Sequence, residues 1–134
     1  MQYLLLIYSN EKAILSASKE ATGQMMAAYT AYIEAMKKAG AYVGANRLQP
    51  TSTATTVRAP NGKSSVLDGP YAETKEQLGG ISILEARDLN HAIQLVSGFP
   101  GFKYGLGPIE IRPAADLNEI MKASEQRRQQ KTAL

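Results

Sequence analysis

Cysteine and tryptophan are absent from the 134 residues of this chain, and histidine occurs only once. Without cysteine the chain cannot form a disulfide, a zinc site with thiolate ligands or a thiol nucleophile. A metal site built on several imidazole groups is excluded as well. We therefore expect no metal and no cofactor, and we look for chemistry carried by carboxylates, guanidinium groups and tyrosine.

The chain also lacks a long hydrophobic run. The apolar stretch at residues 3–8 is too short for a membrane-spanning helix or a signal peptide, and no charged side chain precedes it. The absence of cysteine agrees with a reducing compartment. We expect a cytoplasmic protein that does not contact membranes.

The net charge of +3 is not spread evenly over the chain. Residues 122–134 contain four basic side chains and one acidic one, which leaves eleven of each sign in residues 1–121. A neutral folded part has no basic surface that follows a phosphate backbone. We expect no nucleic-acid partner.

Hydrophobic periodicity predicts two helices. Residues 18–39 have apolar side chains at three- and four-residue spacings and end in two lysines and a glycine, as an amphipathic helix does. Asp88 begins a shorter helix that ends near Gly98. His91 lies one position off the apolar stripe of that helix, so we expect it to be exposed and not catalytic.

The remaining segments predict strands and their connections. Asn61-Gly62 is a strong signal for a β-hairpin. Strands are predicted at residues 2–8, 41–49, 53–59, 64–67, 79–86 and 107–113, with a polar connection at residues 9–17 and a mobile glycine-rich loop over the pocket at residues 98–107.

This order of elements predicts an α+β fold of the ferredoxin-like βαββαβ type, with two helices on one face of an antiparallel sheet. We assign residues 1–115 to this domain. Residues 116–134 are predicted to form a polar C-terminal helix, whose last part frays, and a basic tail.

The first strand predicts a homodimer. The side chains that point to either face of this strand are apolar. One set is Tyr3, Leu5 and Ile7, and the other is Leu4, Leu6 and Tyr8. Helices on one face of the sheet leave the second set uncovered. Burying three large apolar side chains contributes roughly 5–8 kcal/mol. We therefore expect two copies to pack with their sheets face to face.

The stretch Asp68-Gly69-Pro70-Tyr71-Ala72-Glu73-Thr74-Lys75-Glu76 is the candidate site. Glycine and proline shape a turn, and charged loops between rigid elements often carry function. Asp68 and Glu73 are the candidate catalytic acid and base. Alternatively, Asp68 accepts hydrogen bonds within its own turn. Glu73 is then a solvated or helix-capping carboxylate, with Thr74 and Gln77 resembling a capping box.

Four further side chains are candidate ligand-binding residues: Arg58, Tyr71, Lys75 and Arg112. A guanidinium group on a strand binds an acidic ligand or pairs with a carboxylate such as Asp68, Glu73 or Glu85. Tyr71 offers an apolar ring with a polar tip, which suits a cavity wall and equally suits ordinary packing.

The residues from Asp68 to Gly80, Asp-Gly-Pro-Tyr-Ala-Glu-Thr-Lys-Glu-Gln-Leu-Gly-Gly, resemble the hallmark of the YCII-related family, DGPF-domain type, with Tyr71 in place of the phenylalanine. The opening residues 1–8 and the segments 88–93 and 109–113 are similar to that family too. The resemblance implies a ferredoxin-like, dimeric α/β-barrel fold.

Its implications for function are broader. Some relatives in this family are small ring-opening or dehydrochlorinating enzymes, and DGPF-type domains are associated with extracytoplasmic-function sigma factors. One hypothesis is therefore a protein that binds a small acidic or aromatic metabolite near residues 68–76, with or without acid/base catalysis. The alternative is a non-catalytic binding or regulatory module linked to a sigma-factor pathway.

Overall fold

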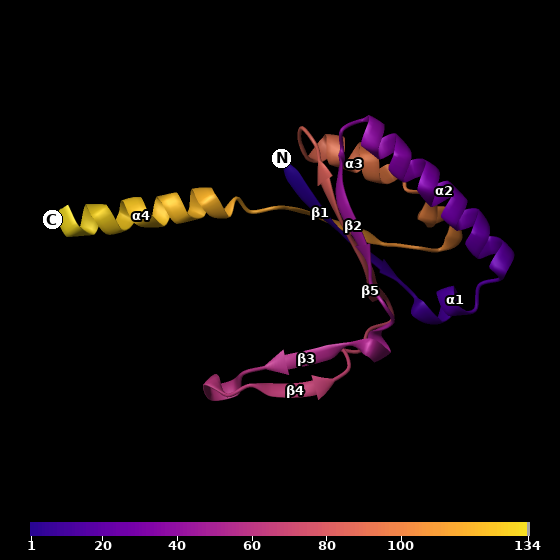
Figure 1. Cartoon of the computed structure of the whole chain (residues 1–134), viewed down its shortest axis with the longest axis horizontal. Helices are drawn as coiled ribbons and strands as arrows, with labels where there is room; N and C mark the ends of the chain where they lie inside the picture. Colours follow the sequence, from indigo (N-terminus) through magenta and orange to yellow (C-terminus); the bar gives the residue numbers. More distant parts are fainter. Residues whose placement is uncertain (134) are drawn as a thin grey trace.

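Figure 1 shows a four-stranded antiparallel sheet with helices packed against one face. The computed structural model describes residues 1–133. The strands are β1 (Gln2–Ser9), β2 (Tyr42–Arg47), β5 (Gln77–Glu85) and β6 (Ile109–Pro113), in the order β2-β5-β1-β6. The predicted α+β class and antiparallel sheet are confirmed, and this strand order is consistent with a ferredoxin-like fold.

The helices α2 (Lys19–Lys38) and α3 (Leu89–Ser97) cover one face of this sheet (Figure 1). Each begins after a side chain that caps its first turn. The Ser18 hydroxyl accepts a hydrogen bond from the Ala21 N–H, and the Asp88 carboxylate accepts one from the His91 N–H. The buried side chains that hold the two layers together are Leu5, Met36, Ala41, Leu84 and Val96, with a second cluster of Tyr3, Ala86 and Ala92.

Tyr32 joins the two helices. Its hydroxyl donates a 2.7 Å hydrogen bond to the Leu95 carbonyl, and its ring packs edge-on against Phe99 at 6.0 Å between centroids. Burial raises the pKa of Tyr32 to about 12, with a smaller contribution from Tyr29. Tyr32 therefore holds α2 against α3 while its phenol is protonated.

The segment predicted as a mobile loop is folded. Residues Pro100–Tyr104 form a 3₁₀ helix, η3, that lies against α2. Phe99 is buried and packs on Phe102 with ring centroids 5.3 Å apart. The prediction missed that an aromatic pair provides enough buried area to order a glycine-rich segment.

Two other segments are more helical than predicted. Residues Glu11–Leu15 form a short helix, α1, capped by the Asn10 side chain, where a polar connection was expected. Helix α4 runs over Leu117–Ala133, so within the described residues the expected fraying is not present.

The predicted hairpin is confirmed as a separate two-stranded sheet of β3 (Thr55–Arg58) and β4 (Ser65–Asp68). Asn61 and Gly62 turn the chain with φ values of 55° and 81°, which asparagine and glycine tolerate. Two 3₁₀ turns, η1 (Thr51–Thr53) and η2 (Pro60–Gly62), precede and join these strands.

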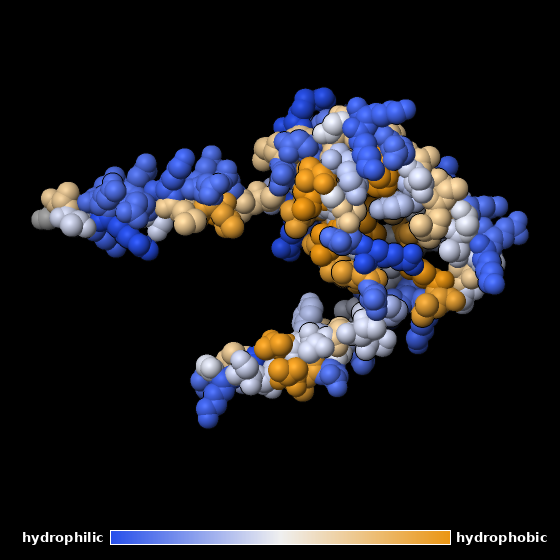
Figure 2. All heavy atoms as spheres, in the orientation of Figure 1, coloured by the Kyte–Doolittle hydropathy of each residue, from blue (hydrophilic) through white to orange (hydrophobic). Residues whose placement is uncertain are grey.

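The hairpin and α4 both project on the side of the sheet away from α2 and α3 (Figure 1). Figure 2 shows apolar side chains on both projections. The exposed large apolar residues there are Val57, Val66 and Leu67 on the hairpin, and Leu117, Ile120 and Met121 on α4. Between the projections, the uncovered sheet face holds Leu4, Leu6 and Tyr8, which the chain itself only half-buries.

We predict that Tyr32→Phe destabilises the protein by about 1 kcal/mol, because the Leu95 carbonyl loses its partner in a partly buried site. Urea unfolding at neutral pH measures the change. Tyr104→Phe is the matched control, since Tyr104 is 40% exposed and its loss of a hydroxyl has no comparable effect.

The same pair of variants gives a dependence on pH. An unfolded tyrosine ionises near pH 10, whereas folded Tyr32 keeps its proton to about 12. The stabilisation by Tyr32 is therefore complete below pH 10 and is lost as the pH rises towards 12. A difference between wild type and Tyr32→Phe that stays constant between pH 8 and pH 11 contradicts this interpretation.

Candidate functional site

A groove of about 420 Å³ opens at one end of the central sheet, where β1 and β2 finish and β5 begins. We call it the sheet-end groove. This volume lies within the range of about 300–1,000 Å³ that is usual for small-molecule sites. Its wall is apolar at Ile14, Leu15, Leu48 and Pro50, and polar at Ser9, Glu11, Arg47 and Gln49.

A β-bulge forms the floor of the groove. The register between β1 and β5 shifts after Ile7, so that Gly79 has no partner on β1. The Gly79 carbonyl instead accepts a 2.9 Å hydrogen bond from the Leu48 N–H, which draws the end of β2 to the same place. A Cβ atom at residue 79 would lie 3.0 Å from the Ser9 hydroxyl oxygen. A β-bulge is therefore present at Gly79, and glycine permits this close approach.

Glu11 fixes the wall on the side of α1. Its carboxylate accepts two hydrogen bonds of 2.8 Å from Thr51, one from the backbone N–H and one from the hydroxyl. Its own N–H donates to the Gln77 side-chain oxygen at 3.0 Å. Both Glu11 oxygens are thus occupied by Thr51, and the start of α1 is tied to η1 and β5.

Gln77 connects the groove to the candidate loop. While its side-chain oxygen accepts from Glu11, its side-chain amide donates to the Thr74 carbonyl. The Thr74 hydroxyl donates to the Glu76 carbonyl. The predicted capping box of Thr74 and Gln77 is wrong, because residue 77 begins a strand and not a helix.

The candidate catalytic residues lie on this loop, outside the groove. Asp68 and Glu73 are both exposed, and neither lines the groove. Within residues 1–133, neither carboxylate accepts a hydrogen bond or forms an ion pair. The alternative in which Asp68 bonds its own turn is therefore not found. The turn is shaped instead by Gly69, whose φ is 105° and whose N–H donates to the Ala54 carbonyl at 2.7 Å.

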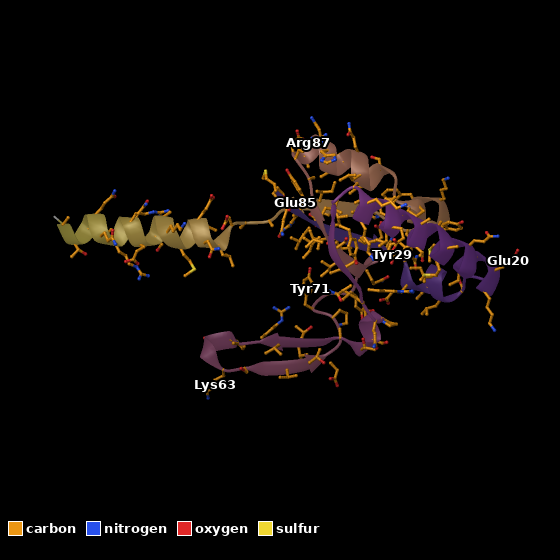
Figure 3. The ribbon with its side chains drawn as sticks, turned by 45° about the horizontal axis from the view of Figure 1, so that its top comes forward. Glu20, Tyr29, Lys63, Tyr71, Glu85 and Arg87 are labelled. Atoms are coloured by element: carbon orange, nitrogen blue, oxygen red, sulfur yellow. The ribbon has the colours of Figure 1, made fainter. Side chains whose placement is uncertain are left out.

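The candidate ligand-binding residues are spread over three elements. Tyr71, which is 79% exposed, and Lys75 belong to the loop, and Figure 3 shows Tyr71 between the hairpin and the sheet. Arg58 lies exposed on the hairpin. Arg112 lies on β6, at the other edge of the sheet from β2, and its Nε pairs with Glu110 at 3.4 Å.

The predicted pairings of the arginines are not formed in the described chain. Arg112 contacts Glu110, and Glu85 binds the N-terminal amine at 2.8 Å. Sequence reasoning also missed Arg47 and Glu11, which do line the groove. Their positions give no local signal, since the groove is assembled from segments around residues 9–15, 47–50 and 79.

His91 serves the start of α3. Its Nδ1 accepts a 3.1 Å hydrogen bond from the Arg87 N–H, and its side chain does not reach the groove. No three histidine, aspartate or glutamate side chains in the described residues lie close enough to hold a metal ion. None of the helices within residues 1–133 is both long enough and apolar enough to span a bilayer.

Comparison with known proteins finds similarities to a family profile, to a sequence relative and to a solved structure. The profile of the YCII-related domain matches residues 1–127, which extends into the first part of α4. An uncharacterized protein of Rhizobium meliloti (strain 1021) is 34% identical over 115 residues, which is 86% of this chain and 93% of that protein.

The third similarity is to a solved structure. It is 5-chloro-2-hydroxyhydroquinone dehydrochlorinase (TftG) from Burkholderia phenoliruptrix AC1100, in complex with 2,5-dihydroxybenzoquinone, at 18% identity and a TM-score of 0.44. The alignment covers 86% of this chain and 94% of the other. At that score the likeness carries no argument about the function of this chain.

Proposed function

This chain belongs to the YCII-related family, and on that premise we propose that it binds a small acidic or aromatic metabolite in the sheet-end groove, beside the loop of residues 68–76. The observation that carries the proposal is the groove itself. It combines an apolar wall with a few polar side chains, which is the usual make-up of a small-molecule site.

The motif that resembles the DGPF type supports this location. Residues 68–80 include both Gln77, which bonds to the groove wall, and Gly79, which forms its floor. The end of the motif thus builds the groove, while its beginning supplies the charged loop. We propose that the chain is of the DGPF type because residues 68–80 resemble that hallmark.

We test ligand binding with benzoate and benzamide, an acidic and a neutral aromatic probe of equal size. Leu15→Glu is expected to abolish binding of both, because it places a charge on the apolar wall. Leu15 is 73% exposed, so the fold tolerates the change. Met26→Glu, on the outer side of α2, is the control that binds as wild type does.

Thermal shift and calorimetric titration of the full chain provide the readout. A ligand at 100 times its Kd adds about 2.7 kcal/mol to the free energy of unfolding, which a thermal shift detects. If Leu15→Glu binds both probes as tightly as wild type, the groove is not the site.

The acid/base part of the proposal assigns proton transfer to Asp68 and Glu73. A carboxylate suits this role when burial favours its protonated form, and both side chains are exposed in the single chain. Catalysis by these residues therefore requires that ligand or a second subunit covers the loop.

For a ligand that is turned over, Asp68→Asn is expected to lower kcat by about 100-fold or more, because the amide does not exchange the proton. The stabilisation by ligand should remain that of wild type. Full turnover by Asp68→Asn would remove this residue from the mechanism. Asp116→Asn, at the base of α4, is the matched control.

We further propose that the functional unit is a homodimer in which the uncovered sheet faces pack together. The half-buried row of Leu4, Leu6 and Tyr8 and the exposed apolar residues of the hairpin and α4 all border the same side of the sheet. Helix α4 has no extensive contact with the rest of its own chain. Helices in proteins owe most of their stability to packing, so we propose that a second copy of the chain provides the surface against which α4 packs.

Leu6→Glu is expected to convert the dimer to a monomer, because it places a charge in the centre of the packed faces. Sedimentation at micromolar concentration measures the change, with Met26→Glu as the variant that remains dimeric. A wild-type protein that sediments as a monomer under these conditions contradicts the proposal.

The second candidate function is a non-catalytic binding or regulatory module linked to an extracytoplasmic-function sigma-factor pathway. It follows from the resemblance of residues 68–80 to the DGPF type. The exposure of Asp68 and Glu73 favours it over catalysis in the single chain. Under this alternative the groove binds ligand, the chain remains in the cytoplasm, and no product forms.

A further inference from the structure

We infer that Arg47 anchors the anionic head of the ligand, and that the sheet-end groove selects a monocarboxylate with a compact apolar body. This inference rests on the proposed function, since it names the ligand class of the same groove. It concerns a residue that the sequence reasoning did not single out.

The charges of the groove point to an anion. Only two of its lining residues are charged, Glu11 and Arg47. Both oxygens of Glu11 already accept hydrogen bonds from Thr51. Arg47 forms no ion pair or side-chain hydrogen bond within the part of the chain that the structure describes. The charge available to a ligand is therefore positive.

The backbone of Arg47 is held while its side chain is free. Arg47 is the last residue of β2 and lies opposite Gly80 of β5. The next residue, Leu48, is fixed by its hydrogen bond to the Gly79 carbonyl. Because residue 80 has no side chain, none stands beside Arg47 on that strand. A guanidinium group on a fixed backbone presents two parallel N–H groups, which match the two oxygens of a carboxylate.

The apolar part of the groove lining suits an apolar body. It is formed by Ile14 and Leu15 from α1 and Leu48 after β2, and Leu15 and Leu48 are 73% and 40% exposed. A dry cavity of about 150 Å³ accepts a benzene ring. The groove, at about 420 Å³, thus has room for one substituted ring or a short chain together with water. An inorganic anion would leave these apolar side chains uncovered.

The experiment compares benzoate with benzamide on the full-length chain, so that only the negative charge differs. Wild type is expected to bind benzoate at least tenfold more tightly than benzamide. Arg47→Gln should lower benzoate affinity by about tenfold or more, because one charge-assisted contact is lost. It should leave benzamide affinity unchanged. Arg47→Lys should fall between the two, since ammonium cannot form the bidentate pair.

Arg87→Gln is the matched control. Arg87 is an exposed arginine just beyond the opposite end of β5 from the groove, as Figure 3 shows, and its loss should change neither affinity. Inorganic phosphate at the same concentration should not displace benzoate, which separates an amphipathic carboxylate site from a general anion site.

The possible outcomes separate this inference from the proposed function. Unchanged benzoate affinity in Arg47→Gln overturns the role of Arg47, while loss of benzamide binding in Leu15→Glu still upholds the groove as the site. Displacement of benzoate by phosphate overturns the ligand class. Failure of wild type to bind either probe at millimolar concentration overturns both the inference and the proposed groove.

Discussion

The apolar character of β1, the strand flanked by β5 and β6, is the constraint on which the rest of the structure depends. The strand lies between β5 and β6, which satisfy its backbone hydrogen bonds, and α2 and α3 cover Tyr3 and Leu5. Its other row is only half-buried by the chain. The strand then ends at Ser9 in the sheet-end groove. One element therefore organises the core, carries a half-buried apolar row and reaches the sheet-end groove.

Much of the fold follows from local patterns in the sequence. Short-range reasoning finds those elements that neighbouring residues specify. The signals are the two apolar sets of β1, the caps Ser18 and Asp88, and the Asn-Gly turn. The errors share a cause. Helix α1 depends on Glu11 reaching Thr51, and η3 depends on Phe99 packing under α2, and both are contacts between distant segments.

The candidate site was predicted less well, for a physical reason. Sequence reasoning selects residues that are unusual in their own stretch, and this identified the turn at Asp68. Arg47 is an ordinary residue at the end of an ordinary strand. It becomes distinctive only because the bulge at Gly79 and helix α1 assemble a groove around it. Concavity and the absence of a charge partner are properties of the folded chain.

The side chain of Gln77 bonds to the wall of the groove and to the charged loop at once. A single rigid amide cannot move towards one without leaving the other. A displacement of the start of α1 that carried Gln77 with it would therefore disturb the hydrogen bond to the Thr74 carbonyl. One amide thus ties the first turn of a helix to a loop more than 60 positions away in the sequence.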